Sequence, residues 1–170
     1  MQNHATFPDT YAGLLQEIRA GASSVPSLAH LQRFIVEIIP QRLPHYNWAG
    51  FYMLDPADPA TLVLGPFNGA PTPHTRIPVS EGICGAAVAQ NGTVIVDDVN
   101  ADPRYLACSL ETKSEIVVPI RAGGAVVGEI DIDSHASAAF TEADRDFLEE
   151  CAAIVGAFIE RAQMPSPVSK

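Results

Sequence analysis

The sequence predicts an α+β domain in which helices cover mainly one side of a central antiparallel sheet. Apolar residues recur at helical spacing near both ends of the chain, and short β-branched runs between Gly, Pro and Asp clusters fill the middle. The expected order is helix, helix, two strands, a short strand, helix, strand, loop, two strands, helix. Strands that follow one another in this way favour an antiparallel sheet with the helices gathered against it.

Composition narrows the class of protein. The 170 residues suit one domain with a sizeable core, and 47% hydrophobic with 18% charged residues is typical of a globular chain. The net charge of -10 argues against nucleic acid and anionic membranes as partners, because both would repel it. No apolar run approaches the roughly 20 residues that cross a bilayer, and residues 1–11 lack the basic and apolar regions of a signal peptide. We therefore expect a cytoplasmic protein.

Two helices are expected at the start of the chain. Residues 11–18 are apolar at helical spacing, and a second helix begins after Ser27, an N-cap residue, and continues until Pro40 and Pro44. These helices look like packing elements and could also supply the face of a homodimer. The chain then divides into N-terminal helices (1–45), a second unit (46–163) and a disordered tail (164–170).

A hairpin is expected next, from strands at 47–54 and 61–66. Trp48 and Tyr52 share their parity along the first strand, so both face the same side of the sheet. A core role is the ordinary expectation for Trp48, and an aromatic wall facing a bound cation is the alternative. Residues 74–79 could form a short edge strand.

The three cysteines differ in their surroundings, and none belongs to a CxxC pair. Cys84 falls in the first turn of a helix capped by Ser80, where the helix dipole can lower a thiol pKa; the small neighbours fit a buried, packed cysteine equally well. Cys108 lies in a long loop without periodic neighbours, as functional residues often do. Cys151 lies within the apolar face of a last helix that Thr141 caps, so we interpret it as core.

Two apolar, β-branched runs, 115–121 and 126–133, flank a glycine pair and predict a second hairpin. Apolar and charged side chains alternate along both runs, so one face of the hairpin is apolar and the other collects acids. Three of these acids are the candidate ligand-binding group: Glu115, Asp131 and Asp133. Glu129 has the same parity.

The register of this hairpin decides whether the acids meet. A two-residue turn at Gly123-Gly124 would set Glu115 beside Ile132 and break the alternation. We therefore expect an odd-numbered loop, 122–124, that pairs Glu115 with Asp131. Carboxylates so close raise each other's pKa or require a cationic guest. The alternative is a solvated outer face, where most strand acids lie.

Several spaced motifs occur along the chain in a consistent order. They are NWAGFYML, LVLGPFNGAP, TRIP, GICGAA, LACSLETKSEIVVPI and GEIDIDS, which FT follows after five residues. From about Trp48 to the last helix the chain thereby resembles the GAF fold, and more narrowly the free methionine-(R)-sulfoxide reductases. These are stand-alone GAF proteins that reduce the unattached amino acid. A GAF fold alone would say little about function, since it serves many ligands.

The resemblance implies a role for each candidate residue. Cys108 would attack the sulfoxide sulfur, and Cys84 would resolve the resulting sulfenic acid through a disulfide. A thioredoxin-like external thiol would close the cycle, with no metal or other cofactor. Substrate binding would fall to five residues: Glu115, Asp131, Asp133, Trp48 and Tyr52.

One departure from the family pattern concerns His74. Many members carry a further cysteine just before the TRIP-like motif, and this chain has His74 in that region. A relay through a third thiol there is impossible, so a direct disulfide between Cys84 and Cys108 must suffice. The competing hypothesis is a GAF module that binds a small ligand without chemistry. A zinc site from His74, Cys84 and Cys108 matches no standard spacing.

Overall fold

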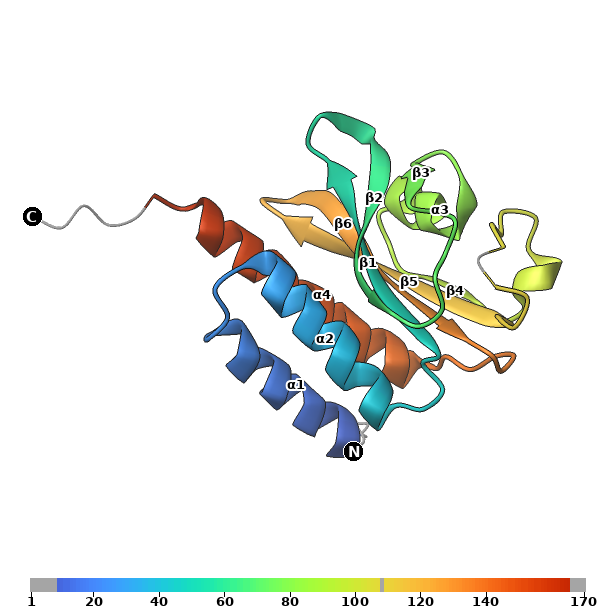
Figure 1. Cartoon of the computed structure of the whole chain (residues 1–170), viewed down its shortest axis with the longest axis horizontal. Coiled ribbons are helices and arrows are strands. Elements are labelled where there is room, and N and C mark those ends of the chain that lie inside the picture. Colours follow the sequence, from blue (N-terminus) through green and yellow to red (C-terminus); the bar gives the residue numbers. More distant parts are fainter. Residues whose placement is uncertain (1–8, 108, 166–170) are drawn as a thin grey trace, which may run out of the picture.

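The computed structural model describes residues 9–107 and 109–165. Six antiparallel strands form one sheet in the order β3-β2-β1-β6-β5-β4 (Figure 1). Helices α2 and α4 lie against one face of the sheet, α1 packs on these two helices, and α3 lies on the other face, which confirms the predicted fold class. The helices are α1 (Asp9–Ala22), α2 (Leu28–Arg42), α3 (Gly82–Gln90) and α4 (Glu142–Gln163), with a short 3-10 helix at Val99–Ala101; the strands are β1 (Trp48–Asp55), β2 (Asp58–Asn68), β3 (Arg76–Pro78), β4 (Val94–Val96), β5 (Ser114–Ala122) and β6 (Ala125–Ser134).

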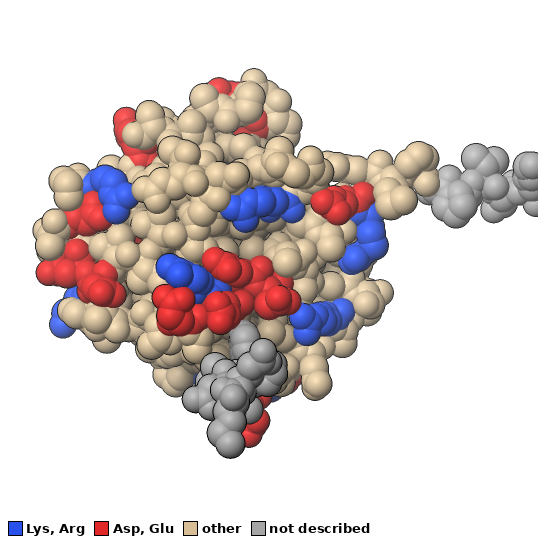
Figure 2. All heavy atoms as spheres, turned by 180° about the vertical axis from the view of Figure 1, so that it is seen from behind, with Lys and Arg blue, Asp and Glu red and all other residues tan. Residues whose placement is uncertain are grey.

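The molecular surface mixes charges of both signs. On the face turned toward the viewer in Figure 2, acidic side chains gather near the middle and basic side chains lie singly around them. Among residues 9–107 and 109–165, no helix has both the length and the apolar character to cross a membrane.

The two N-terminal helices form where the apolar spacing places them. Ser27 caps α2 as predicted, with its Oγ accepting a hydrogen bond from the His30 N–H at 3.4 Å. The helix ends at Arg42, between Pro40 and Pro44, as predicted. Proline removes one backbone donor, yet so near the helix end that loss is tolerated. The Leu43 N–H still donates to the Ile39 carbonyl at 2.9 Å and closes the last turn.

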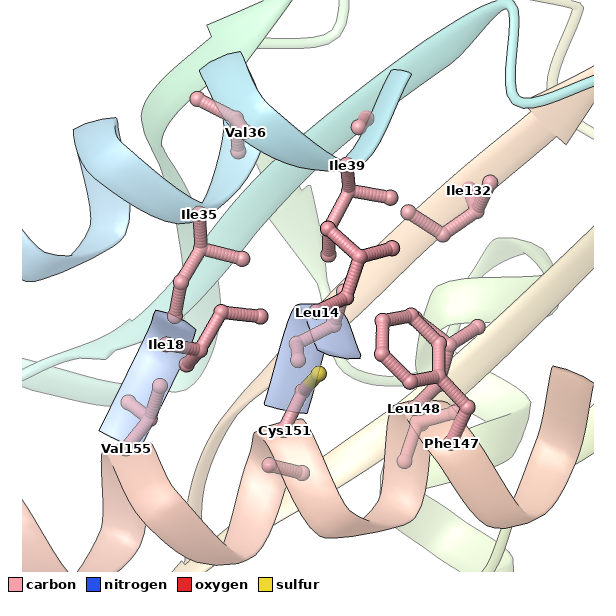
Figure 3. Packing of buried hydrophobic residues seen from close by; sticks show 14 of the residues in the cluster. Leu14, Ile18, Ile35, Val36, Ile39, Ile132, Phe147, Leu148, Cys151 and Val155 are labelled. Carbon is pink, nitrogen blue, oxygen red and sulfur yellow. The ribbon is translucent and has the colours of Figure 1, made fainter. Parts of the chain in front are cut away.

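The main core lies between α1, α2, α4 and the apolar face of the sheet (Figure 3). Cys151 points from α4 into this cluster and is fully buried, as predicted, and burial raises the pKa of its thiol. The labelled side chains around it include Leu14, Ile18, Ile35, Ile39, Phe147 and Val155. Helices α1 and α2 share this core with α4. The predicted division of the chain at residue 45 stays a prediction. Of the expected tail, residues 166–170 lie outside the described part.

The β5-β6 hairpin departs from the expected turn. Ala122 pairs with Ala125, so Gly123 and Gly124 form a two-residue turn, with φ of 59° and 79°. Such a turn needs positive φ at both central positions, and glycine adopts these values without steric cost. The three-residue loop that we expected is therefore absent.

A bulge restores the alternation that this turn alone would break. The register shifts between Ile120 and Arg121, which pair with Gly128 and Val126, so that β6 has one extra residue at this point. Beyond the bulge Glu115 faces Asp133, and not Asp131 as predicted. The predicted parity is correct, while the predicted partner is wrong by two residues.

Helix α3 covers the other face of the sheet. Its N-cap is Glu81 and not Ser80, and the Glu81 side chain makes no capping hydrogen bond. It ends at Asn91, which adopts the left-handed conformation with φ of 50°. A second, smaller apolar cluster forms beneath α3 and includes Ile83, Cys84 and Val117.

Candidate active site

The acidic side chains of the hairpin lie on the face that α3 covers. Glu115, Asp131 and Asp133 are only 4%, 3% and 4% exposed, so the alternative of a solvated outer face is wrong. The α3 helix packs over this part of β5 and β6. The fold thus removes three carboxyl groups from water, which is costly without compensating partners.

Glu129 is a fourth acid in this group, and the sequence analysis did not select it as a site residue. It is fully buried on β6, two residues before Asp131, and opposite Tyr52 of β1. Neither of its carboxylate oxygens has a hydrogen-bond partner among the described residues. Its parity in β6 was the available signal, since it is shared with Asp131 and Asp133.

Cys84 meets the acids from the α3 side. Its thiol, 5% exposed, donates a hydrogen bond to Asp131 Oδ2 at 3.6 Å. Ligand atoms of Cys84, Glu115 and Asp131 all lie within 4.8 Å of one another. This spacing is compatible with one shared guest, either a hydrogen-bonding group or an ion.

Burial and like charges set the protonation of the Cys84 thiol. Burial first, and then the charges of Asp131, Glu129 and Glu115, raise its pKa well above the usual value. Of the two interpretations of Cys84, the thiol with a lowered pKa is therefore wrong. The favourable end of a nine-residue helix does not offset desolvation beside three acids.

The acids themselves differ in protonation. Burial raises the pKa of Glu129 and of Asp133 well above the usual range, and the nearby Asp131 charge raises both further. Burial also raises the pKa of Asp131, but only to about 6, because hydrogen bonds from Glu115 and Cys84 oppose it. Burial therefore favours the neutral form of Glu129 and Asp133, while Asp131, with its pKa of about 6, is mostly ionised at neutral pH.

Two aromatic rings line the acids along β1. Trp48 pairs with Asp133 and Tyr52 with Glu129, and the two rings stack with centroids 6.4 Å apart. Gly50 lies between them opposite Asp131, and a Cβ there would come within 2.3 Å of the Trp48 ring. The close approach of the Trp48 ring therefore requires glycine at this position.

Hydrogen bonds fix the orientation of both rings. The Trp48 indole N–H donates to the Ala70 carbonyl at 3.0 Å, and the Tyr52 hydroxyl donates to the His74 carbonyl at 2.7 Å. The predicted shared side of Trp48 and Tyr52 is confirmed, because both belong to the cluster beneath α3.

Cys108 lies outside the described residues, so its predicted role stays a prediction. The residues on either side of it border the acids. Leu106 lines a small cavity with Cys84, Glu115 and Asp131, and Ser109 lines a second cavity of about 60 Å³ with Trp48 and Asp133. His74, whose role the sequence left open, has its Nε2 3.2 Å from the Ala107 carbonyl.

Comparison with known proteins places this geometry in a family. Residues 26–160 match the model of the GAF domain. The chain is 36% identical to the free methionine-R-sulfoxide reductase of Escherichia coli over 143 residues, which are 84% of each protein. The chain belongs to this reductase family. The free methionine-R-sulfoxide reductase of Saccharomyces cerevisiae is 44% identical over 110 residues, which are 64% of this chain and 61% of the yeast protein.

Solved structures of the reductase family agree with the fold. The free methionine-R-sulfoxide reductase from Neisseria meningitidis, solved in complex with its substrate, is 35% identical and superposes with a TM-score of 0.85. The match covers 91% of this chain and 92% of the other. Sheet, α3 and the flanking helices are thus shared with a reductase of this family over nearly the whole chain.

The buried charge of Asp131 should lower the stability of the folded protein. In metal-free buffer at pH 8, Asp131→Asn should raise the free energy of unfolding by about 1 to 3 kcal/mol, because it removes an ionised carboxylate from a buried site. The folded pKa of about 6 lies above the ordinary value near 4, so the gain should shrink as pH falls from 6 and vanish below about pH 4. Urea denaturation across this pH range measures it. The exposed Asp97→Asn is the control, and an equal gain in both variants would contradict the prediction.

Proposed function

We propose that this chain reduces free L-methionine (R)-S-oxide to L-methionine, with Cys108 as the nucleophile and Cys84 as the resolving thiol. The observation that carries the proposal is the set of buried carboxyl oxygens without hydrogen-bond partners among residues 9–107 and 109–165. Asp131 Oδ1, Asp133 Oδ1 and both oxygens of Glu129 belong to this set. An ammonium group offers three donors and a positive charge, which is what such a site lacks.

The substrate has two further parts that the site can recognise. Its apolar chain can lie against the stacked rings of Trp48 and Tyr52, which are held in place by hydrogen bonds. Its ammonium group can bind the ionised Asp131 and the neighbouring Glu115. Family membership and the substrate complex of the Neisseria meningitidis relative support free methionine sulfoxide as the substrate.

Reduction of the sulfoxide transfers its oxygen to sulfur of the enzyme. The Cys108 thiolate attacks the sulfoxide sulfur, one proton is delivered to the sulfoxide oxygen, the bond between this oxygen and the substrate sulfur breaks, and methionine leaves as Cys108 becomes a sulfenic acid. A neutral carboxylic acid is the appropriate proton donor. Asp133 fits this role, because burial raises its pKa and so favours the protonated form, and because it lines the same cavity as Ser109.

The second step regenerates the sulfur. The Cys84 sulfur attacks the sulfenic acid, the S–O bond breaks, a disulfide forms, and water leaves. Cys84 must first lose its proton, and Asp131, ionised and already accepting from the thiol at 3.6 Å, is placed to take it. The raised pKa of Cys84 keeps it protonated, and therefore less reactive, until that step.

A thioredoxin-like dithiol reduces the disulfide and completes the cycle, so no metal or other cofactor takes part in turnover. The reducing conditions that this cycle needs agree with a location in the cytoplasm. The homodimer suggested by the N-terminal helices stays a prediction.

Selectivity for the unattached amino acid is the sharpest test of this function. Turnover of free (R)- and (S)-sulfoxide and of N-acetylmethionine sulfoxide should be compared, with dithiothreitol as reductant. We expect kcat/KM for the N-acetyl compound to be at least about 100-fold lower, because an amide cannot replace an ammonium group at buried carboxylates. Binding of the free sulfoxide without formation of methionine would instead indicate a GAF module that senses a ligand.

A further inference from the structure

The Cys84 end of the acid cluster has the geometry of a small metal site. Cys84, Glu115 and Asp131 border a cavity of about 10 Å³, roughly the space of one water molecule or one ion. Tyr52, Ile77 and Leu106 close the cavity with apolar or aromatic surface. As it stands, this space is suited to an ion rather than to an amino acid.

The distance between Cys84 Sγ and Asp131 Oδ2 agrees with tetrahedral coordination. Zinc binds thiolate sulfur at about 2.3 Å and carboxylate oxygen at about 2.0–2.2 Å, so the two donors of a tetrahedral site are about 3.6 Å apart. Cys84 Sγ and Asp131 Oδ2 are 3.6 Å apart, and Glu115 places an oxygen within 4.8 Å of both. Three protein ligands leave a fourth position open.

A second observation points to a cation at the same place. The other oxygen of Asp131, Oδ1, is buried without a hydrogen-bond partner in the described part of the chain, and the carboxyl group of Glu129 is fully buried beside Cys84. A divalent cation would compensate the cost of burying these groups more fully than water could.

We propose that the reduced protein binds one zinc-like divalent cation through Cys84, Glu115 and Asp131, and that this cation and free methionine sulfoxide exclude each other. The thiolate ligand favours zinc over magnesium or calcium. On binding, the S–H bond of Cys84 breaks, a metal–sulfur bond forms, and the proton passes to solvent with no change in oxidation state. The bound ion occupies the carboxylates that would hold the substrate ammonium group and withdraws the resolving thiol. Binding of the cation is independent of the proposed function, and only the mutual exclusion with methionine sulfoxide rests on it.

Binding is measured most clearly in a protein whose only thiol is Cys84. Cys108→Ser with Cys151→Ser leaves this one cysteine. Titration of this variant with Co²⁺ should produce thiolate-to-metal charge-transfer absorption that saturates at one ion per chain. Zn²⁺, titrated against a chromophoric chelator, should displace the cobalt.

Three further substitutions, each made in the single-thiol variant, test the ligand set. Adding Cys84→Ser should abolish the charge-transfer band, and Asp131→Asn should weaken zinc binding at least about 10-fold. Asp133→Asn removes a carboxylate from the same cluster but outside the ligand set, and it should change zinc affinity by less than about 3-fold. Circular dichroism confirms that each variant is folded. Equal losses in Asp131→Asn and Asp133→Asn would overturn the proposal, because zinc binding would then not depend on the proposed ligands.

Competition separates this inference from the reductase function. Saturating free methionine sulfoxide should lower the apparent zinc affinity of the single-thiol variant at least about 10-fold, and N-acetylmethionine sulfoxide should not. Absence of a cobalt–thiolate band would refute the metal site and leave turnover by the wild type untouched. A saturating band in a protein whose wild type shows no turnover would refute the reductase function and leave the metal site standing.

Discussion

Replacing Cys108 by serine should lower kcat/KM for free methionine (R)-S-oxide by at least about 1,000-fold. A serine hydroxyl is not ionised at neutral pH, and it cannot form a sulfenic acid, so the oxygen-transfer step is lost. Substrate affinity, measured by calorimetry, should change little, since the carboxylates and aromatic rings that hold the amino acid remain. Methionine formation in a single turnover, without added reductant, measures the first step directly.

The other two cysteines are the controls for this experiment. Cys84→Ser should still form one methionine per chain in a single turnover, and it should lose most of its turnover with thioredoxin, because the sulfenic acid can no longer become an internal disulfide. Cys151→Ser, in the core on the opposite face of the sheet, should retain activity. If Cys84→Ser fails in a single turnover while Cys108→Ser succeeds, the two roles are reversed.

The second large effect concerns stability and arises at Asp144, far from the acid cluster. Its carboxylate accepts hydrogen bonds from the hydroxyl groups of Tyr11 and Tyr46, both at 2.7 Å, and from the backbone N–H of Thr141 at 2.8 Å. His45 Nε2 lies 3.2 Å away. One buried side chain thereby joins α1, the loop between α2 and β1, and the start of α4.

Replacing Asp144 by alanine should lower the free energy of unfolding by about 3 to 5 kcal/mol. The variant loses the N-terminal cap of α4 and leaves two buried tyrosine hydroxyls without their acceptor. Chemical denaturation at pH 7 measures the loss. The exposed Asp146→Ala, in the same helix, is the control, and a loss below about 1 kcal/mol in Asp144→Ala would contradict this account.

The pH dependence of this contribution has a definite sign. Hydrogen bonds from His45, Thr141 and the two tyrosines outweigh burial and hold the pKa of Asp144 well below its usual value. A lowered pKa in the folded state stabilises the protein above the unfolded value near 4 and is lost as pH falls through the folded value. The difference between wild type and Asp144→Ala should therefore be constant from pH 8 to about pH 5 and shrink below about pH 4. This trend is measured by the same denaturation series.

Alternation of side chains along the strands made much of the site predictable. The shared parity of Glu115, Asp131 and Asp133 placed these acids on one face of the hairpin. The shared parity of Trp48 and Tyr52 placed both rings on one side of their strand, and in the structure that side is the face that carries the acids. The partner of Glu115 was not predictable, because the bulge at Ile120 leaves no mark in the apolar pattern. Alternation is the same for every even shift of register.

The protonation state of Cys84 could not be predicted from the sequence either. Its position at the start of α3 suggested a lowered pKa, but the deciding groups come from β5 and β6, which lie 30 or more residues further along the chain. Glu129 was overlooked for a related reason. A carboxylate in a strand is ordinarily solvated, and only the packing of α3 over β6 shows that this one is buried.

Strand β6 serves the core and the pocket at once. Ile130 and Ile132 anchor it in the helical core, while the acids between and beside them point to the opposite face. A change in the packing of either isoleucine would therefore displace the carboxylates without touching the substrate. Mutational scans of this strand should accordingly find few positions at which loss of fold and loss of affinity can be separated.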